Sequence, residues 1–159
     1  MAESLKDKIV FITGASAGIG KSCAEQFAAE GAKLILAARR IERLHELAEN
    51  LKDKYGTDSV SYQLDVCDRN AVKNVIENFP QDWKSVDILL NNAGLSQGLD
   101  KIQDGDIDDW ERMIDTNVKG LLYITKYILP GMIKRESGHV INISSIAGLG
   151  VYPLGNVYC

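Results

Sequence analysis

The chain has 159 residues, with 18 Lys and Arg against 22 Asp and Glu, so its net charge is −4. Its apolar fraction of 45% is enough for the core of one globular domain. The mild acidity disfavours nucleic acid and anionic membrane surfaces as main partners, and no apolar run approaches the roughly 20 residues of a membrane span. The first eight residues hold no apolar signal core, so we expect a cytoplasmic protein.

The cysteines and histidines predict no metal site. Cys23, Cys67 and Cys159 are widely spaced and form no C-x-x-C pair. An odd number of such cysteines indicates neither a disulfide framework nor a zinc site, and we expect Cys23 and Cys67 to be buried as small apolar side chains. His45 and His139 have no further ligand at metal-binding spacing.

Apolar strand-like runs alternate with amphipathic stretches along the chain. The pattern predicts strands at 9–12, 34–37, 60–64, 87–90 and 140–143, and helices at 19–30, 41–51, about 68–78 and about 108–129. We expect the last helix to end near Pro130, because proline removes a helical hydrogen bond. The strands are apolar almost throughout, so the sheet must be covered on both faces. The fold class is therefore α/β, with a doubly wound parallel sheet between two layers of helices.

Each predicted strand is followed by glycine or polar residues. These segments are 13–20, 38–40, 65–66, 91–94 and 144–145. In doubly wound sheets, ligands bind outside the carboxyl ends of the strands. Five such segments therefore predict a ligand site at one edge of the sheet.

The first of these segments, Thr-Gly-Ala-Ser-Ala-Gly-Ile-Gly at 13–20, stands between a predicted strand and a predicted helix. Glycine adopts positive φ and lets a phosphate approach the backbone, while the helix offers unpaired N–H groups. The segment therefore predicts a phosphate-binding turn. Residues 15–22 also approach the P-loop pattern, which would place Lys21 on phosphates and Ser22 on magnesium. A nucleotide triphosphatase is thus an alternative, although 60–65 makes only a poor magnesium-holding strand.

The second segment carries positive charge where NAD-binding proteins usually carry an acid. Counting 18 residues from Gly20 reaches the uncharged Ala38, and Arg39 and Arg40 follow. A guanidinium group pairs with a 2′-phosphate through two hydrogen bonds, whereas a carboxylate would repel it. The two arginines therefore predict NADP(H) as the cofactor.

Asn117 lies inside the last predicted helix, on a stripe with Met113, Leu121 and Ile124. Asparagine is a poor residue for a helix interior, and a buried amide needs hydrogen-bond partners. Asn117 is either a core amide that bridges backbone groups or a functional residue, and the two roles are compatible.

Four motifs in this order resemble the short-chain dehydrogenase/reductase family: the glycine turn at 13–20, Asn-Asn-Ala-Gly at 91–94, Asp-Thr-Asn at 115–117 and Ile-Ser-Ser at 143–145. The resemblance runs from about residue 6 to the last residue. Within the family, residues 36–44, 152–153 and 158–159 are similar to the NADP-dependent 3-hydroxy acid (serine/allo-threonine type) dehydrogenases. The resemblance implies a single NADP(H)-binding Rossmann domain over 1–159, with the first five strands of the family fold. It also implies hydride transfer between NADP(H) and an alcohol/carbonyl substrate, in a homodimer or homotetramer.

The resemblance also implies a role for individual residues. The catalytic residues would be Asn117, Ser145 and Tyr158, and Ser145 and Tyr158 would also contact the substrate. The cofactor would be held by Gly14, Ser16, Gly18, Ile19 and Gly20 at the pyrophosphate, Arg39 and Arg40 at the 2′-phosphate, Asp65 and Val66 at the adenine, and Asn92, Ala93, Gly94 and Tyr158 at the ribose and nicotinamide.

The family's Tyr-x-x-x-Lys motif is incomplete here, because Tyr158 is followed by one residue only. In the family that Lys, together with the nicotinamide ring, makes the phenol a stronger acid. We therefore expect the chain to be part of a longer protein that carries the rest of the fold, to be inactive alone, and to leave its last strand as an open sheet edge. A dinucleotide-binding module without turnover is the second functional hypothesis.

Overall fold

The computed structural model of the chain describes residues 5–159, which contain five strands and five α-helices. In chain order they are β1 (Ile9–Thr13), α1 (Gly18–Ala29), β2 (Lys33–Ala38), α2 (Ile41–Tyr55), β3 (Ser59–Gln63), α3 (Arg69–Glu77), β4 (Ile88–Asn91), α4 (Ile107–Ile114), α5 (Leu121–Lys134) and β5 (His139–Asn142). Short helical turns at Gln81–Trp83, Ile146–Gly148 and Asn156–Tyr158 and a π-helical turn at Asp115–Gly120 complete the secondary structure. Within residues 5–159, no helix has the length and apolar character needed to cross a membrane.

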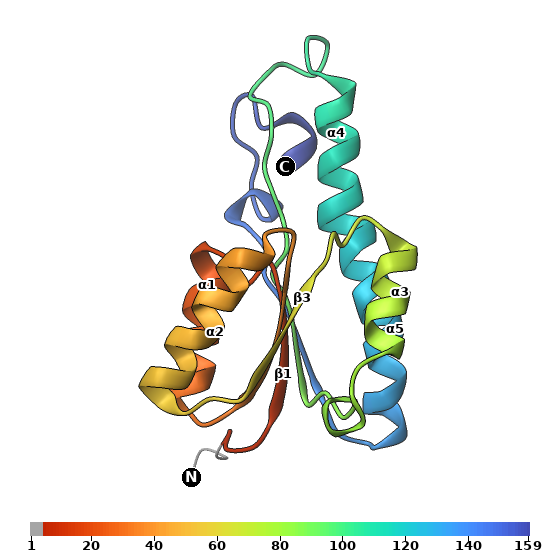
Figure 1. Ribbon diagram of the computed structural model, residues 1–159. Coiled ribbons are helices and arrows are strands. Elements are labelled where there is room, and N and C mark those ends of the chain that lie inside the picture. The colour runs from red at the N-terminus through yellow and green to blue at the C-terminus, as the bar shows by residue number, and fades with distance from the viewer. Residues whose placement is uncertain (1–4) are drawn as a thin grey trace.

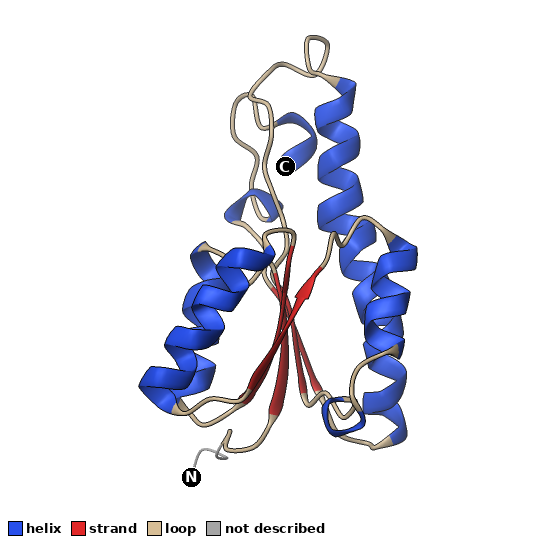
Figure 2. Cartoon of the chain, viewed as in Figure 1, coloured by secondary structure: helices blue, strands red, loops and turns tan. Residues whose placement is uncertain are grey.

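The five strands form one parallel sheet in the order β3-β2-β1-β4-β5. The arrows in Figure 2 run the same way, and the loops after them gather at the upper edge. The direction of strand addition reverses between β1 and β4, which is the position where doubly wound sheets bind ligands. The predicted α/β Rossmann-type fold is confirmed, and β5 lies at one edge of the sheet, as expected.

Helices cover both faces of the sheet, with α1 and α2 on one side and α3 and α5 on the other (Figure 1). Successive residues of β1 point to opposite faces, so Val10 packs in the core under α1 and α2 while Phe11 packs in the core under α3 and α5. Every residue of β1 is buried as a result. This two-sided burial explains why the central strands are apolar at almost every position.

The last predicted helix differs from the expectation in two ways. It is interrupted by a wider π-helical turn at Asp115–Gly120, which separates α4 from α5. It also continues through Pro130 to Lys134, so the predicted end at Pro130 is wrong. Proline costs the helix one hydrogen bond, but Ile128 and Met132 on either side of it are buried in the core and hold the final turn in place.

The prediction that Cys23 and Cys67 are buried is also wrong, since both are partly exposed free thiols. On α1 the fully buried positions are Gly20, Ala24 and Ala28. Small residues there let the helix approach the sheet closely, and Cys23 is displaced to the rim of that contact. Cys67 lies in the loop after β3, where its Sγ is 3.2 Å from Thr116 Oγ1.

Candidate active site

A cavity of about 760 Å³ lies at the carboxyl ends of the strands, within the range of cofactor sites of roughly 300–1,000 Å³. Its walls include residues from all five predicted strand-end segments. The predicted site residues that line it are Gly14, Ser16, Gly18, Ile19, Arg39, Arg40, Asp65, Val66, Asn92, Ala93, Gly94, Asn117, Ser145 and Tyr158. Residues as far apart in the sequence as Gly14 and Tyr158 therefore line one cavity at the switch point of the sheet.

The N-terminus of α1 supplies the first wall of this cavity. The helix is preceded by Ala17, which offers no side-chain cap, and its first turn contains no acid. In contrast, α3 is capped by Asp68 and α4 by Asp106, whose carboxylates accept backbone N–H groups. The uncapped end of α1 thus keeps free N–H groups and the positive end of the helix dipole for an anion.

Glycine is favoured at three positions of this turn for three different structural reasons. Gly18 has φ +53°, and no protein atom lies within 4 Å of the place that a Cβ would take, so a side chain there would project into open space. Gly14 has φ +67°, and a Cβ would lie 2.9 Å from Ala93 Cα. Gly20 is absent from the cavity wall, and a Cβ there would lie 2.5 Å from the carbonyl oxygen of Gly14. Gly20 therefore lets α1 pack directly against the turn.

Arg39 and Arg40 follow β2 and are both exposed at the cavity. Arg40 Nη2 donates to Ser16 Oγ at 3.3 Å, which joins the arginine pair to the glycine turn. Gln63 Nε2 donates to the backbone oxygen of Arg39 at 3.1 Å and fixes the chain there. The two guanidinium groups thus stand beside the anion-binding turn, as a 2′-phosphate would require.

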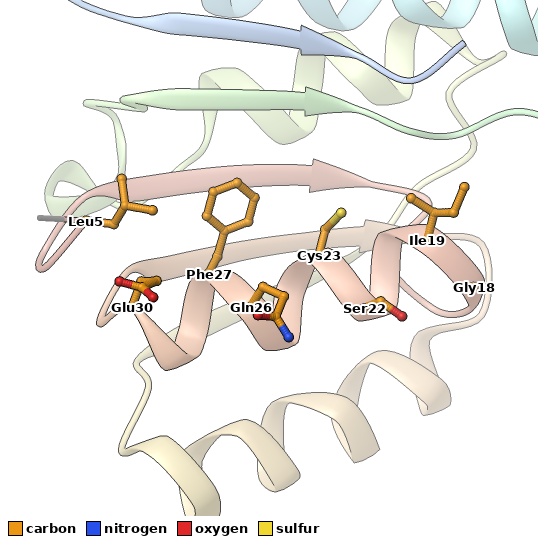
Figure 3. A pocket seen from close by; sticks show the side chains of 8 residues that line it. All are labelled: Leu5, Gly18, Ile19, Ser22, Cys23, Gln26, Phe27 and Glu30. Carbon is orange, nitrogen blue, oxygen red and sulfur yellow. The ribbon is translucent and has the colours of Figure 1, made fainter. Parts of the chain in front are cut away.

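Lys21 and Ser22, the residues that a P-loop would use, lie outside this cavity. Ser22 instead borders a separate apolar groove of about 590 Å³ along α1. Figure 3 shows Ile19, Cys23 and Phe27 of α1 pointing toward the strands, with Ser22 and Gln26 on the other side of the helix. The structure therefore gives no support to the triphosphatase alternative.

The loop after β3 forms the next part of the wall. Asp65 accepts the backbone N–H of Cys67 at 3.0 Å and remains exposed in the cavity. Val66 is buried against Gly120, where a Cβ would lie 2.6 Å from Val66 Cγ2. Burial raises the pKa of the Cys67 thiol, so that side chain stays a neutral neighbour of this wall.

One buried hydroxyl joins the loops after β1 and β4. Thr13 Oγ1 accepts the backbone N–H groups of Asn92 and Ala93, both at 3.1 Å. The Asn92 side chain returns the contact by donating to the carbonyl oxygen of Thr13 at 3.0 Å. These bonds hold the segment 91–94 against the glycine turn.

Asn117 lies in the π-helical turn and binds the loop after β4. Its Oδ1 accepts the N–H of Leu95 at 2.9 Å, and its Nδ2 donates to the carbonyl oxygen of Leu95 at 2.7 Å. The interpretation of Asn117 as an amide that bridges backbone groups is therefore confirmed. A π-helical turn of this kind is frequent at functional sites, because it turns side chains out of the regular helical row.

Ser145 and Tyr158 follow β5 and face the same cavity. Ser145 Oγ accepts the N–H of Ala147 at 3.2 Å, so the hydroxyl proton stays available for donation. Tyr158 is half-buried in the short helix Asn156–Tyr158, and Asn156 Nδ2 donates to the carbonyl oxygen of Asp100 at 3.0 Å. This last bond ties the loop after β5 to the loop after β4.

Several cavity residues were not singled out from the sequence. They include Leu95, Ser96 and Gly148. Leu95 and Ser96 directly follow the predicted segment 91–94, so a segment extended by two residues includes them. Gly148 gives no such signal, because its place depends on the path of the loop after β5.

The residues present fit a dinucleotide phosphate. Open space at Gly18, the uncapped helix end and the arginine pair form a continuous anion-binding wall. Apart from Asp65, the rest of the cavity offers backbone groups and uncharged side chains to the remainder of such a molecule. Among residues 5–159, no three or more His, Cys, Asp or Glu side chains are grouped so that they could hold a metal ion.

A parallel sheet with a glycine-rich anion turn at its switch point defines a dinucleotide-binding protein of the Rossmann class. The family model of the short chain dehydrogenases matches residues 8–159. The chain belongs to that family, and the resemblance stated from its motifs is confirmed.

Known relatives place the chain in one part of the family. It is 47% identical over 150 residues to an NADP-dependent 3-hydroxy acid dehydrogenase of Salmonella typhi, which covers 94% of this chain and 59% of the relative. Serine dehydrogenase from Escherichia coli matches with a TM-score of 0.87 and 47% identity, over 94% of this chain and 68% of that one. The closed form of serine dehydrogenase complexed with NADP+ matches with a TM-score of 0.88 and 47% identity, over 94% and 59%. The chain thus spans about three-fifths of the length of the curated relatives it matches.

Proposed function

We propose that this chain is the dinucleotide-binding domain of an NADP(H)-dependent oxidoreductase that interconverts an alcohol and a carbonyl compound, with 3-hydroxy acids as the substrate class. The single observation that carries the proposal is the cavity, which joins an arginine-flanked anion turn to Ser145 and Tyr158. The identity to 3-hydroxy acid and serine dehydrogenases supports the substrate class.

In this proposal, the nucleotide end of the cavity binds and selects the cofactor. The N-terminus of α1, with Ser16 and Ile19, would hold the pyrophosphate, and Gly20 would support that turn from behind. Arg39 and Arg40 would pair with the 2′-phosphate. Asp65 and Val66 would flank the adenine, and residues 92–94 would line the ribose and nicotinamide.

The opposite end acts on the substrate oxygen. Bound NADP(H) supplies or accepts the hydride at the substrate carbon. Ser145 would donate its free hydroxyl proton to the substrate oxygen, and Tyr158 would give that oxygen a proton in the reducing direction. Asn117 would keep the neighbouring loop in place through Leu95, and its second Nδ2 hydrogen is free to bind a water.

Replacing Arg39 with Asp tests the cofactor assignment. The reversed charge would face the 2′-phosphate, so we expect NADPH affinity to fall on the order of 100-fold. NADH lacks that phosphate, and its affinity should change less than about threefold. Fluorescence titration of the purified protein with each nucleotide measures both values.

Arg43→Asp is the matched control, because Arg43 is exposed on α2 and lies outside the cavity. It makes the same charge change and should leave both affinities unaltered. Equal losses for NADPH and NADH in Arg39→Asp would contradict the 2′-phosphate assignment. NADPH binding by the full-length protein that contains this chain, without oxidation of any 3-hydroxy acid, would instead favour a binding module without turnover.

We also propose that two copies of the chain pair through α4 and α5, which form one continuous column in Figure 1. Apolar residues recur at intervals of four or seven along this column and are each at least 37% exposed: Ile107, Ile114, Val118, Leu122, Leu129 and Ile133. Charge is also unequal, since α4 carries Asp108, Asp109 and Glu111 against Arg112, whereas α5 carries Lys126 and Lys134 and no acid. An antiparallel two-fold pairing would bury the apolar stripe and place the acidic half against the basic half.

Light scattering on the purified protein tests this pairing. We expect a mass of two chains or a multiple of two, and Leu122→Asp at the centre of the stripe should shift the mass to one chain. Leu99→Asp is the control, because Leu99 is similarly exposed and lies outside the stripe. An unchanged mass in Leu122→Asp would remove the stripe as the interface.

The proposed location is the cytoplasm. Cys23, Cys67 and Cys159 are free thiols in the structure, which suits a reducing compartment. Fractionation of the source cells, followed by detection of the chain, tests this location directly.

A further inference from the structure

The loop after β3 is anchored to the π-helical turn at two points. Cys67 Sγ lies 3.2 Å from Thr116 Oγ1, and either group can donate in this contact. Val66 packs against Gly120, where a Cβ would lie 2.6 Å from Val66 Cγ2. These two contacts fix Val66 and Cys67 relative to the helical column that α4 and α5 form.

Asp65 is held in place through the same loop. Its Oδ1 accepts the backbone N–H of Cys67 at 3.0 Å, and its carbonyl oxygen accepts the N–H of Asp68 at 3.1 Å. The carboxylate is exposed, and Asp65 lines the cavity together with Thr116. A carboxylate has about four acceptor positions. The bond from Cys67 therefore fixes the direction of this carboxylate and leaves other lone pairs for a ligand.

The Cys67 thiol stands between the Thr116 hydroxyl and the Asp65 carboxylate. Burial raises the pKa of the thiol, the Thr116 hydroxyl lowers this pKa, and the Asp65 carboxylate raises it. The net shift is upward, so the thiol is protonated at neutral pH. A protonated thiol is both a weak donor and a weak acceptor, and it can therefore link a hydroxyl on one side to a carboxylate on the other. These contacts run from the π-helical turn to the cavity.

We propose that Thr116 and Cys67 are positioning residues that direct the Asp65 carboxylate at the 6-amino group of the adenine, and so make the cavity selective for that base. The inference rests on the proposed function, in which Asp65 and Val66 flank the adenine, and it adds the residues that give this wall its selectivity. An amino group donates to a carboxylate, whereas a carbonyl oxygen at the same ring position would be repelled by it. The strength of such a bond depends on its angle, so the direction of the carboxylate decides the selectivity.

The hypoxanthine analogue of NADPH tests this assignment, because it has a carbonyl oxygen where adenine has its amino group. Fluorescence titration of the purified full-length protein that contains this chain measures the affinity for each nucleotide. We expect the unchanged protein to prefer NADPH about tenfold. Valine has the shape of threonine without the hydroxyl, so Thr116→Val should reduce this preference to less than about threefold. Thr116→Ser keeps the hydroxyl and should restore the preference.

A double-mutant cycle separates positioning from direct contact between Thr116 and the cofactor. Cys67→Ala should lower the preference for NADPH as Thr116→Val does. The double variant should lose no more preference than either single variant, within about a factor of two. Losses that multiply in the double variant would mean that Thr116 acts without Cys67, and would overturn the assignment.

Thr57→Val is the matched control, because Thr57 is a buried threonine outside the cavity, and its hydroxyl makes no hydrogen bond within residues 5–159. It makes the same change of side chain and should leave the preference for NADPH unchanged. Equal losses of affinity for both nucleotides in Thr116→Val would indicate a purely structural role and would contradict the inference. An equal loss of preference in Thr57→Val would also contradict it. Circular dichroism shows that each variant is folded.

Turnover separates this inference from the proposed function. A full-length protein that selects NADPH through Thr116 and Cys67 but oxidises no 3-hydroxy acid would contradict the proposed function alone. A protein that oxidises a 3-hydroxy acid with NADP+ and binds both nucleotides with equal affinity would contradict the inference alone. A protein that binds neither nucleotide would contradict both.

Discussion

At the nucleotide end of the cavity, close backbone contacts act together with side-chain hydrogen bonds such as that from Asn92 to Thr13, whereas the loops at the end that carries Ser145 and Tyr158 are joined by side-chain hydrogen bonds. At the first end, Gly14 and Gly20 allow direct contact between main-chain segments, and α1 is left without a cap. At the second end, Asn117 holds Leu95, and Asn156 holds Asp100. The two ends therefore depend on different kinds of residue and should respond differently to substitution.

Burial separates the two ends as well. The strands β1 and β2 are buried at nearly every residue, while the outer residues of β5 are exposed. Beyond β5, Ile146 and Leu149 are 84% and 93% exposed. The nucleotide end thus belongs to the packed core, and the other end consists of loops linked across long sequence separations.

The largest effect is expected from Gly20→Ala, which attacks the close contact at the nucleotide end. The new methyl group would lie 2.5 Å from the Gly14 carbonyl oxygen and would also meet Asn92 Nδ2. Because both neighbours are held in place, we expect the free energy of unfolding to fall by about 3 kcal/mol. Urea denaturation followed by circular dichroism measures the loss.

Gly18→Ala, two residues earlier in the same turn, sharpens this test. Its methyl group meets no protein atom, so only the positive φ of +53° opposes it, at a cost of about 1 kcal/mol. The methyl group would, however, occupy cavity space and weaken NADPH binding. If the free energy of unfolding fell equally in the two variants, the assignment of Gly20 to packing and of Gly18 to ligand contact would be wrong.

A smaller effect is expected from Asn117→Ala at the other end. Removal of the amide leaves both backbone groups of Leu95 without a partner, which should cost about 2 kcal/mol. The loss should be local, so hydrogen exchange at the Leu95 amide should accelerate while exchange in β1 stays slow. Mass-spectrometric hydrogen exchange on the purified protein reads both regions.

Asn50→Ala provides the control for this substitution. Asn50 is an exposed asparagine of α2 that donates to the carbonyl oxygen of Glu46, and its loss should change stability by less than about 0.5 kcal/mol. If Asn117→Ala were as mild as Asn50→Ala, the loop at Leu95 would not depend on the amide.

The same contrast explains what could be predicted from the sequence. The glycine turn and the arginines were found because strand, turn and helix are adjacent in the chain, and their spacing has a local cause. The partner of Asn117 could not be found, since Leu95 lies 22 residues away and the contact depends on the path of a loop. The prediction that the helix ends near Pro130 is wrong because burial of Ile128 and Met132 outweighs a local helix-breaking preference.

Ser96 shows the same limit at the level of a single side chain. It directly follows the motif at 91–94, yet nothing in the sequence indicates that its two neighbours face the helix while it faces the cavity. That alternation appears only once Gln97 and Leu95 are seen bound to α4 and the π-helical turn. Sequence spacing predicts where the site lies, and the three-dimensional contacts show which of its residues are anchored to the helix and which face the cavity.

The hydroxyl of Thr13 has a thermodynamic consequence for ligand binding. It is buried and accepts the N–H groups of Asn92 and Ala93. The conformational entropy of that segment is therefore lost during folding, so an incoming molecule does not have to order it. Folding stability and ligand affinity are linked through this one oxygen atom, because a substitution that removes its two hydrogen bonds lowers both.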